Sequence, residues 1–365
     1  MREKRAWLEL QADRVEGVLA NLNAPCRITG GTVGPRVVRF FLQPHPYTRF
    51  KMVKGLTDEL GMALGARQVR VDVGEQGGIV LEFPNPDQVA FGFDTALAGK
   101  TLPPMTVFLG LQTDGVPLLA NLNAPEVAHI LIAGTTGCGK STLLRSIVAS
   151  LVLYNRPSAV SLLVIDPKGR TLPVDFCTRH FVQPVISTVE GMSLALGALV
   201  ALMEQRDRDH VSSPSVVLIV DELADLVMTS GASHLLTRLL QRGREAGIHV
   251  VAATQRPSAA ILSGLMRANF PLCIAGKVVS PEDIRIAAGR GQVGAERLQG
   301  RGDFIAVIEN LIRFQAPWIS VKMLWDLARN AGALGRDAVR LPMLSDALRR
   351  EAERASVTAW PIDLN

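Results

Sequence analysis

Residues 134–141, with the sequence GTTGCGKS, constrain the fold of this chain more than any other stretch. They satisfy the pattern Gly-x-x-x-x-Gly-Lys-Ser/Thr, and they stand between a strand-like run at 128–134 and a helical pattern at 141–153. In such a loop the glycines let backbone N–H groups face the phosphates, the lysine reaches the β- and γ-phosphates, and the serine hydroxyl ligates Mg²⁺. The strand before and the helix after favour this interpretation over a chance match.

The sequence therefore predicts ATP and Mg²⁺ as cofactors, bound by a continuous segment. The predicted nucleotide-binding residues are Gly134, Thr135, Thr136, Gly137, Cys138, Gly139, Lys140, Ser141 and Thr142. Cys138 contributes its backbone, because the variable positions of this motif need no particular side chain. Ser141 is also a predicted Mg²⁺ ligand.

A second motif follows the apolar run at 215–220, which ends in Asp221 and Glu222. An aspartate at the carboxyl end of a core strand can hold the Mg²⁺ shell, and the adjacent glutamate can orient and polarise the attacking water. The alternative is an acidic start of a helix after a strand. The phosphate-binding loop in the same chain favours the catalytic interpretation, so Asp221 is the second predicted Mg²⁺ ligand and Glu222 the predicted base.

A third polar residue, Gln255, ends the apolar run at 248–255. Glutamine is a poor strand residue and is costly to bury without a partner. If this strand belongs to the same sheet, Gln255 lies at the same edge as Asp221 and Glu222, where it can contact the γ-phosphate or the attacking water. The alternative is a glutamine that caps the following loop with its amide.

Six apolar runs alternate with helical patterns from about residue 128 onward, which predicts a parallel α/β sheet. The runs are 128–134, 161–167, 215–222, 248–255, 271–278 and 302–308. Because the run at 161–167 lies between the two motifs in sequence, we expect the phosphate-loop strand and the Asp-Glu strand to flank an inserted strand. This is the arrangement of additional-strand ATPases.

The upstream part of the chain predicts a separate, smaller unit. Short alternating segments surround one helix-like stretch at 49–65, which is typical of an α+β fold, and a Pro/Gly-containing passage at 96–110 follows. We therefore expect a small α+β subdomain with an amino-terminal helix at 1–100, a P-loop ATPase domain at 101–330 and a helical tail at 331–365.

Composition restricts the class of protein further. No uncharged run approaches the ~18 residues that a membrane span needs, and the charged start at 1–14 lacks the apolar core of a signal peptide, so we expect no membrane segment. The four cysteines lack metal-ligand spacing and suit a reducing cytoplasm. The window 238–303 holds ten basic and five acidic residues, an excess equal to the net charge of +5 of the whole chain. This local basic surface suits a phosphate backbone, although a solvated face would give the same count.

Seven segments, in their order along the chain, resemble the motor domain of the FtsK/SpoIIIE family of DNA translocases. They are AGTTGCGKS, IDPK, LMEQR, VDELADL, REAGIHVVAATQRPS, LMRANFP and GAERLQGRGDF. Three upstream segments, VGPRVVRFFLQP, LTDELGMALGARQVRV and LEFPNP, resemble that family's β subdomain. The resemblance covers roughly residues 10–325, and it implies a RecA-like motor that forms a hexameric ring around double-stranded DNA.

The resemblance also assigns roles to single residues. Lys140, Ser141, Asp221, Glu222 and Gln255 match the family's nucleotide-site positions. The segment KVVSPEDIR is similar to the one whose final arginine reaches the nucleotide of the neighbouring subunit, which makes Arg285 the preferred arginine finger. Arg242 and Arg244 are its competitors.

In such a ring, the segments after the Gln255 strand and before the run at 302–308 should face the pore and grip DNA phosphates. The predicted DNA-binding residues are Arg256, Arg267, Arg290, Arg297 and Arg301. The alternative is that some of these arginines cap helices or pair with Glu296 and Asp303.

Two other functions share this fold. A type VII secretion-like ATPase would act on polypeptides, but such proteins string several ATPase domains behind a membrane segment. A nucleotide-binding regulator would need no complete catalytic set. Septal members of the family carry a membrane portion and a C-terminal winged-helix module; we expect neither, because the chain starts just before the subdomain and the end at 341–365 is too short for the module.

Overall fold

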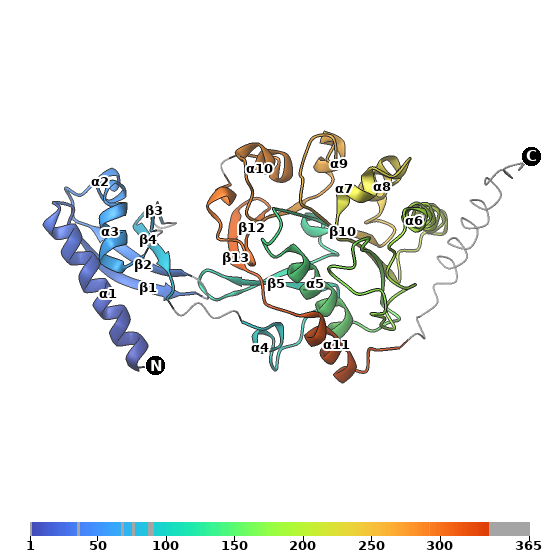
Figure 1. Ribbon diagram of the computed structural model, residues 1–365, viewed down its shortest axis with the longest axis horizontal. Helices are drawn as coiled ribbons and strands as arrows, with labels where there is room; N and C mark the ends of the chain where they lie inside the picture. Colours follow the sequence, from blue (N-terminus) through green and yellow to red (C-terminus); the bar gives the residue numbers. More distant parts are fainter. Residues whose placement is uncertain are drawn as a thin grey trace, which may run out of the picture. The chain divides into compact units, whose positions relative to one another are not determined.

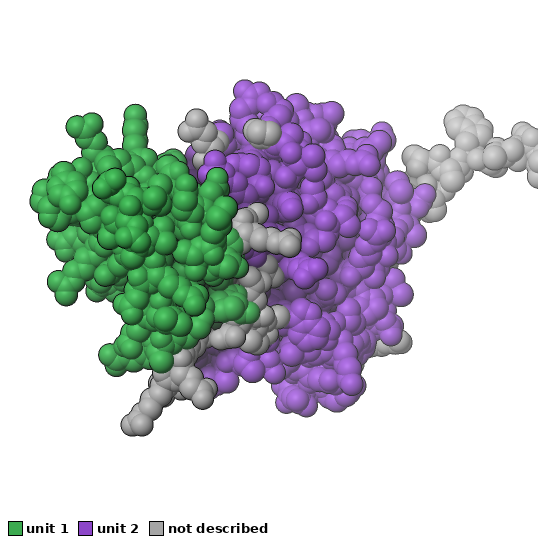
Figure 2. All heavy atoms as spheres, turned by 60° about the vertical axis from the view of Figure 1, so that its left-hand side comes forward, with its two compact units in different colours: residues 1–91, 111–117 green, residues 92–110, 118–365 purple. Residues whose placement is uncertain are grey.

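The computed structural model describes residues 2–34, 37–66, 69–74, 77–86, 91–291 and 293–335 (Figure 1). The chain divides into two compact units, Met1–Phe91 with Leu111–Pro117, and Gly92–Gly110 with Leu118–Asn365 (Figure 2). The first unit thus includes the tip of a hairpin that a single boundary near residue 100 does not anticipate. Most of the predicted tail at 331–365 lies outside the described residues.

The first unit is an α+β fold with a four-stranded antiparallel sheet of order β1-β2-β4-β3. Its elements are α1 (Arg2–Asn21), β1 (Cys26–Val33), β2 (Val37–Pro44), α2 (Phe50–Gly55), α3 (Thr57–Leu64), β3 (Arg70–Val73) and β4 (Ile79–Pro84). One face of α1 buries Val15 and Leu19 against Phe40 and Leu81 of the sheet and Leu60 of α3. The predicted helical stretch at 49–65 is divided in two at Leu56, which leaves helical geometry (ψ 21°).

The second unit contains the remaining elements. These are α4 (Phe93–Ala96), β5 (Thr106–Gln112), β6 (Pro117–Asn121), η1 (Pro125–Val127), β7 (His129–Ala133), α5 (Lys140–Tyr154), β8 (Val160–Ile165), α6 (Val189–Asp209), β9 (Ser215–Val220), α7 (Leu223–Val227), α8 (Ala232–Arg242), β10 (Ile248–Thr254), α9 (Gly264–Ala268), β11 (Leu272–Ala275), α10 (Pro281–Ala288), η2 (Ala295–Arg297), β12 (Asp303–Val307), β13 (Leu311–Gln315) and α11 (Val321–Asn330).

Nine strands form one sheet of order β6-β5-β13-β12-β11-β7-β10-β9-β8. The five strands from β11 to β8 are parallel, and every residue of β7, β8 and β10 is buried. Continuous burial of this kind is typical of a parallel sheet with both faces covered. The carboxyl ends of β7, β10, β9 and β8 therefore meet at one edge, and this edge carries the predicted catalytic residues.

Two details of the predicted sheet were wrong. An additional strand does lie between the phosphate-loop strand β7 and the Asp-Glu strand β9, but it is β10 and not β8, which lies at the edge of the sheet. The run at 302–308 supplies β12, which is antiparallel to β11. All six runs are predominantly apolar, and this pattern carries no information about lateral order or direction.

Two buried histidines lie at the starts of neighbouring strands: His129 is the first residue of β7, and His249 is the second residue of β10. Nδ1 of His129 accepts a hydrogen bond of 3.0 Å from Val250 N, and Nδ1 of His249 lies 3.1 Å from the carbonyl oxygen of Ala128. Burial lowers the pKa of His129 to about 3, with help from the charge of His249, and burial lowers the pKa of His249 to about 4. Both rings are therefore neutral in the folded chain at neutral pH.

These two pKa values make the stability depend on pH. Between about pH 6.5 and their folded values, the unfolded chain binds more protons than the folded one, so the free energy of unfolding should fall on acidification. The expected loss is about 1.4 kcal/mol per pH unit for each histidine. Urea unfolding at pH 7 and pH 5.5 checks this. His129→Asn, which keeps an acceptor without titrating, should reduce the loss, whereas the exposed His234→Asn should not; equal losses in both variants would contradict the assignment.

Candidate nucleotide-binding and catalytic site

The predicted phosphate-binding loop joins β7 to α5 and is anchored from two neighbouring strands. Gly134 N donates to the carbonyl oxygen of Thr254 at the end of β10 (3.2 Å), and Thr135 N donates to that of Lys277 after β11 (2.8 Å). Lys140 opens α5. The loop therefore lies at the carboxyl edge of the parallel strands and at the amino end of a helix, where backbone N–H groups favour an anion.

A second loop, containing Arg301, rests directly on this one. Arg301 N donates to Gly137 O (3.3 Å) and Gly302 N donates to Cys138 O (2.6 Å). The approach is so close that a Cβ on Gly139, whose φ is 111°, would lie 2.7 Å from Gly302 N. Glycine at 139 is therefore required by both conformation and space. The structure thus places the backbone of Arg301, a predicted DNA contact, against the nucleotide loop.

Lys140 lies folded across its own loop. Its Nζ donates to the carbonyl oxygens of Gly134 (2.6 Å) and Thr135 (3.1 Å). The side chain is nearly buried, so these carbonyls replace the water that an ammonium group otherwise needs. Cys138 is also buried, which raises the pKa of its thiol, so the thiol stays protonated and acts as a packing group.

Asp221 directly follows β9 and is 6% exposed. Its Oδ1 accepts from the hydroxyl of Thr171 at 2.5 Å and from that of Ser141 at 3.4 Å. Burial raises the pKa of this carboxyl, and the charge of Asp166 adds to the rise, while the two hydroxyl donors oppose it.

The oxygens of Ser141 and Asp221 fit Mg²⁺, which prefers hard oxygen ligands and would relieve the cost of burying this carboxylate. Among the described residues, no group of three or more His, Cys, Asp or Glu side chains could hold a metal ion by itself. This also fits Mg²⁺, which proteins commonly bind through one or two side chains together with substrate phosphates.

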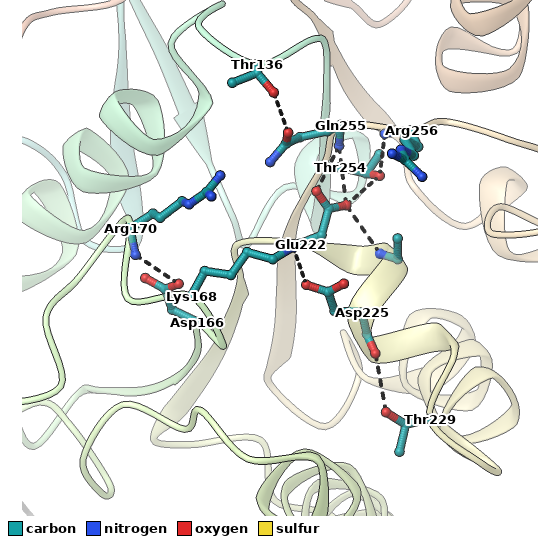
Figure 3. A network of polar contacts seen from close by, with 11 residues as sticks. Thr136, Asp166, Lys168, Arg170, Glu222, Asp225, Thr229, Thr254, Gln255 and Arg256 are labelled. Atoms are coloured by element: carbon teal, nitrogen blue, oxygen red, sulfur yellow. Dashed lines mark hydrogen bonds and ion pairs between the residues drawn. The ribbon is translucent and has the colours of Figure 1, made fainter.

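Glu222 is held in place by the next strand and is 5% exposed. Its Oε1 accepts from the hydroxyl of Thr254 (2.9 Å) and from Ala224 N (3.4 Å), and its Oε2 accepts from Gln255 N (3.2 Å) (Figure 3). These donors come from β10 and from the start of α7, and they replace the hydration that burial removes. A carboxylate fixed in this way can orient a water molecule and accept its proton.

Gln255 links this carboxylate to the phosphate-binding loop. Its backbone N–H bonds to Glu222, and its side-chain Oε1 accepts from the hydroxyl of Thr136 at 2.6 Å (Figure 3). The link exists because β10 lies between β7 and β9 in the sheet. Gln255 thus reaches both motifs at the same edge, as the sequence predicted; its side chain reaches across to the nucleotide loop and does not simply cap its own.

Several residues of the site were missed by the sequence analysis. Thr254 holds Glu222, and Thr171 holds Asp221. Lys168 Nζ lies 2.7 Å from Asp225 Oδ2, which brings a cation beside the start of α7 (Figure 3). The segment IDPK at 165–168 includes Lys168, and the segment REAGIHVVAATQRPS includes Thr254, but neither pattern gave these residues a role.

The predicted arginine finger, Arg285, lies on α10 with its side chain 66% exposed and pairs with Glu282 at 2.6 Å. Its competitors are exposed as well: Arg242, which pairs with Asp207 at 2.6 Å, and Arg244. Exposure is what a residue acting on a neighbouring subunit needs. All three arginines meet that condition.

The predicted DNA-binding arginines differ in their exposure and in their contacts. Arg256 and Arg297 are exposed, and Arg297 has a long ion pair of 3.5 Å with Glu296. Arg267 is half-buried and packs so tightly on Gly289 that a Cβ there would lie 2.1 Å from its Nη2.

Arg290 donates to the carbonyl oxygen of Glu309 at 3.2 Å. Asp303, a suggested partner for these arginines, is instead paired with Arg313 at 2.9 Å. Arg290 and Arg301 are exposed as Arg256 and Arg297 are, but Arg290 bonds to the carbonyl oxygen of Glu309 and the Arg301 backbone bonds to the nucleotide loop. We therefore take Arg256 and Arg297 as the members of the set to test against a large ligand.

No helix within the described ranges is long and apolar enough to cross a membrane. Comparison with known families gives two matches. Residues 94–211 and 207–259 match the FtsK/SpoIIIE family, and residues 1–85 match the FtsK alpha domain. The expected likeness of the first unit to the family's β subdomain was therefore wrong: its sequence pattern is that of the alpha domain.

Curated relatives cover most of the chain. It is 32% identical over 353 residues to the DNA translocase SftA of Bacillus subtilis, covering 88% of this chain and 37% of the relative. It is 33% identical over 337 residues to the DNA translocase FtsK of Halalkalibacterium halodurans, covering 83% of this chain and 42% of the relative. The chain thus spans about two fifths of the length of these relatives.

Solved structures share the fold. The conjugation coupling protein TcpA of pCW3, solved as a monomer with ATPγS, aligns with a TM-score of 0.60 at 18% identity, over 88% of this chain and 99% of that one. The type VII secretion ATPase EccC of Thermomonospora curvata aligns with a TM-score of 0.58 at 22% identity, over 69% of this chain and 35% of that one. The solved structures thus show a P-loop ATPase fold, and the family matches with the curated relatives show that the chain belongs to the FtsK/SpoIIIE family.

Proposed function

We propose that this chain is an ATP-driven motor that moves double-stranded DNA through a homo-hexameric ring in the cytoplasm. The observation that carries the proposal is the contact chain from Thr136 through Gln255 to Glu222, which joins the nucleotide loop to the predicted base. A motor needs such a connection, because the state of the γ-phosphate has to reach elements that move. A passive nucleotide-binding regulator needs no base held at this position.

The residues divide the work of hydrolysis among them. ATP supplies the phosphoanhydride bond, and a bound Mg²⁺ would neutralise phosphate charge. Lys140 exchanges its two loop carbonyls for phosphate oxygens, and Ser141 and Asp221 would hold the metal ion. Glu222 orients a water molecule and accepts its proton. The Gln255 amide distinguishes the site with a γ-phosphate from the site after the γ-phosphate has left.

DNA is the better-supported cargo. The curated relatives are named DNA translocases, and the first unit matches the FtsK alpha domain. The likeness to EccC supports a common fold but not polypeptide transport, because its identity is only 22%. The exposed Arg256 and Arg297 add positive charge suited to phosphates.

The test compares DNA binding by the parent chain and by the Arg256→Ala/Arg297→Ala double variant. If both arginines contact phosphates, the slope of log affinity against log salt should fall by roughly 1.8, about 0.9 for each contact, without a change in sequence preference. Fluorescence anisotropy on a long duplex with a non-hydrolysable nucleotide measures this. Arg329→Ala, an exposed arginine of α11, is the matched control.

The same preparations decide between the two cargoes. Long duplex DNA should raise the ATPase rate of the parent chain, whereas unfolded polypeptide should not. Stimulation by polypeptide alone would favour the secretion ATPase. A double variant with an unchanged salt slope would remove these two arginines from the DNA interface.

A further inference from the structure

The loop after β8 is folded around one buried carboxylate. Asp166 is fully buried, and its Oδ1 accepts from Arg170 N at 3.2 Å (Figure 3). Its Oδ2 accepts from Thr171 N at 2.8 Å and from Leu172 N at 3.0 Å. Three backbone donors on one carboxylate fix the path of the loop and compensate for burial of the charge. The position of Thr171 is therefore set by the fold of this loop.

This loop directs the hydroxyl of Thr171 at the predicted metal ligand. Thr171 is 1% exposed, and its Oγ1 lies 2.5 Å from Asp221 Oδ1. The sheet brings the two residues together, because β8 and β9 are parallel neighbours and Asp221 N donates to Ile165 O at 3.0 Å. Thr171 and Asp221 are 50 residues apart in sequence.

In the described part of the chain, Asp221 Oδ1 has one other side-chain donor nearby, and its bond is longer. Its neighbour Asp166 is also a carboxylate and repels it, and the Ser141 hydroxyl is at the longer distance of 3.4 Å. A carboxylate in this position needs a donor that does not compete with the metal ion for the same site. Thr171 provides such a donor from the loop after β8, which is separate from the nucleotide loop between β7 and α5.

The loop is also tied to the helix that carries the nucleotide site. Arg145 of α5 reaches both the carbonyl oxygen of Thr171 and the hydroxyl of Thr142, each at 3.4 Å. Thr142 is adjacent to Ser141. Thr171 is thus connected to both predicted Mg²⁺ ligands. It bonds directly to Asp221, and Arg145 links it to Thr142, the neighbour of Ser141.

We propose that Thr171 is a positioning residue for Mg²⁺: its hydroxyl fixes the orientation of the Asp221 carboxylate relative to Ser141. The proposal rests on the proposed function, since it needs a Mg²⁺–nucleotide complex at this site. Partners of this kind, which hold a ligand and not the metal, typically contribute 10- to 100-fold to metal affinity.

The experiment measures binding of a fluorescent ATP analogue, first in EDTA and then in a Mg²⁺ titration, on the parent chain and on Thr171→Val. The valine keeps the shape and removes the hydroxyl. The Mg²⁺ concentration for half-maximal binding should rise about 10- to 100-fold in the variant, while the affinity in EDTA stays within about threefold. Thr171→Ser should restore the parental Mg²⁺ dependence, because serine retains the donor.

Thr178→Val is the matched control, since Thr178 is also fully buried but its hydroxyl bonds to the backbone N–H of His180. Thermal melting in EDTA identifies a general loss of stability, which would lower affinity with and without Mg²⁺ alike. Thr171→Ala is the second hydroxyl-free variant and replaces the valine should that one fail to fold.

A hydroxyl-free variant with parental Mg²⁺ dependence would overturn the proposal, as would a serine variant as defective as the valine. A failure of the proposed function would give a different result, because it would already be seen in the parent chain. If nucleotide binding by the parent chain did not depend on Mg²⁺, the assignment of the metal site would be wrong, and so would the role of Thr171.

Discussion

Glu222→Gln should bind ATP as the parent does and turn it over about 10²- to 10⁴-fold more slowly, the usual contribution of a general base. Glutamine keeps the length of the side chain and an oxygen that can accept from Thr254 and Gln255, so the site should remain assembled. Only proton acceptance is lost. Equilibrium binding of labelled ATP, followed by phosphate release from the same sample, measures both quantities.

Lys140→Ala should fail at the earlier step. The variant removes the ammonium group that now bonds to two carbonyls of the loop, so both the phosphate contact and the internal support of the loop disappear. We expect weak nucleotide binding and no trapped ATP. Glu245→Gln, an exposed glutamate between α8 and β10, is the control for the change of charge. Near-normal turnover in both Lys140→Ala and Glu222→Gln would refute the assignment of the site.

The nucleotide loop and its catalytic edge were predictable because each depends on local sequence plus one general rule. The loop motif lies within eight residues, and the polar residues 221, 222 and 255 each end an apolar run. In a parallel sheet the carboxyl ends of neighbouring strands meet at one edge. Contacts between these residues then follow once the strands are known to be neighbours.

The rest depended on contacts that no local pattern encodes. The composition does not tell whether β8 or β10 is the inserted strand, because both are continuously buried apolar runs. Thr171 gave no signal, since a threonine that holds a carboxylate 50 residues away has the same local sequence as one in any loop.

The contacts of the five predicted DNA-binding arginines could not be predicted from the sequence either. Five were grouped by their position along the chain, but the fold uses them differently. Arg267 packs on Gly289 and Arg290 bonds to a carbonyl oxygen. Arg301 belongs to a turn that bonds to the nucleotide loop. A positive charge alone does not distinguish a phosphate contact from a structural one, because the same guanidinium serves both.

Arg285→Ala should abolish turnover while nucleotide still binds, if this arginine completes the site of a neighbouring subunit. An arginine supplied in trans is worth about 10³- to 10⁵-fold in turnover. Arg285 is exposed, and its ion pair is with the exposed Glu282 one turn earlier on α10, so its removal should leave the fold intact. Activity per chain of the parent should also rise with protein concentration, because the site is incomplete in a monomer.

A mixing experiment separates action in trans from a defect within one chain. Arg285→Ala chains retain Glu222, and Glu222→Gln chains retain Arg285, so each variant alone should be inactive. In mixed rings, an Arg285→Ala subunit beside a Glu222→Gln subunit regains a complete site, and up to about a quarter of the interfaces in an equal mixture should be active. The same mixture with Arg242→Ala or Arg244→Ala tests the two other exposed candidates. Recovery with one of these variants, together with full activity of Arg285→Ala, would transfer the role to that residue, and no recovery in any mixture would contradict an arginine supplied by the neighbour.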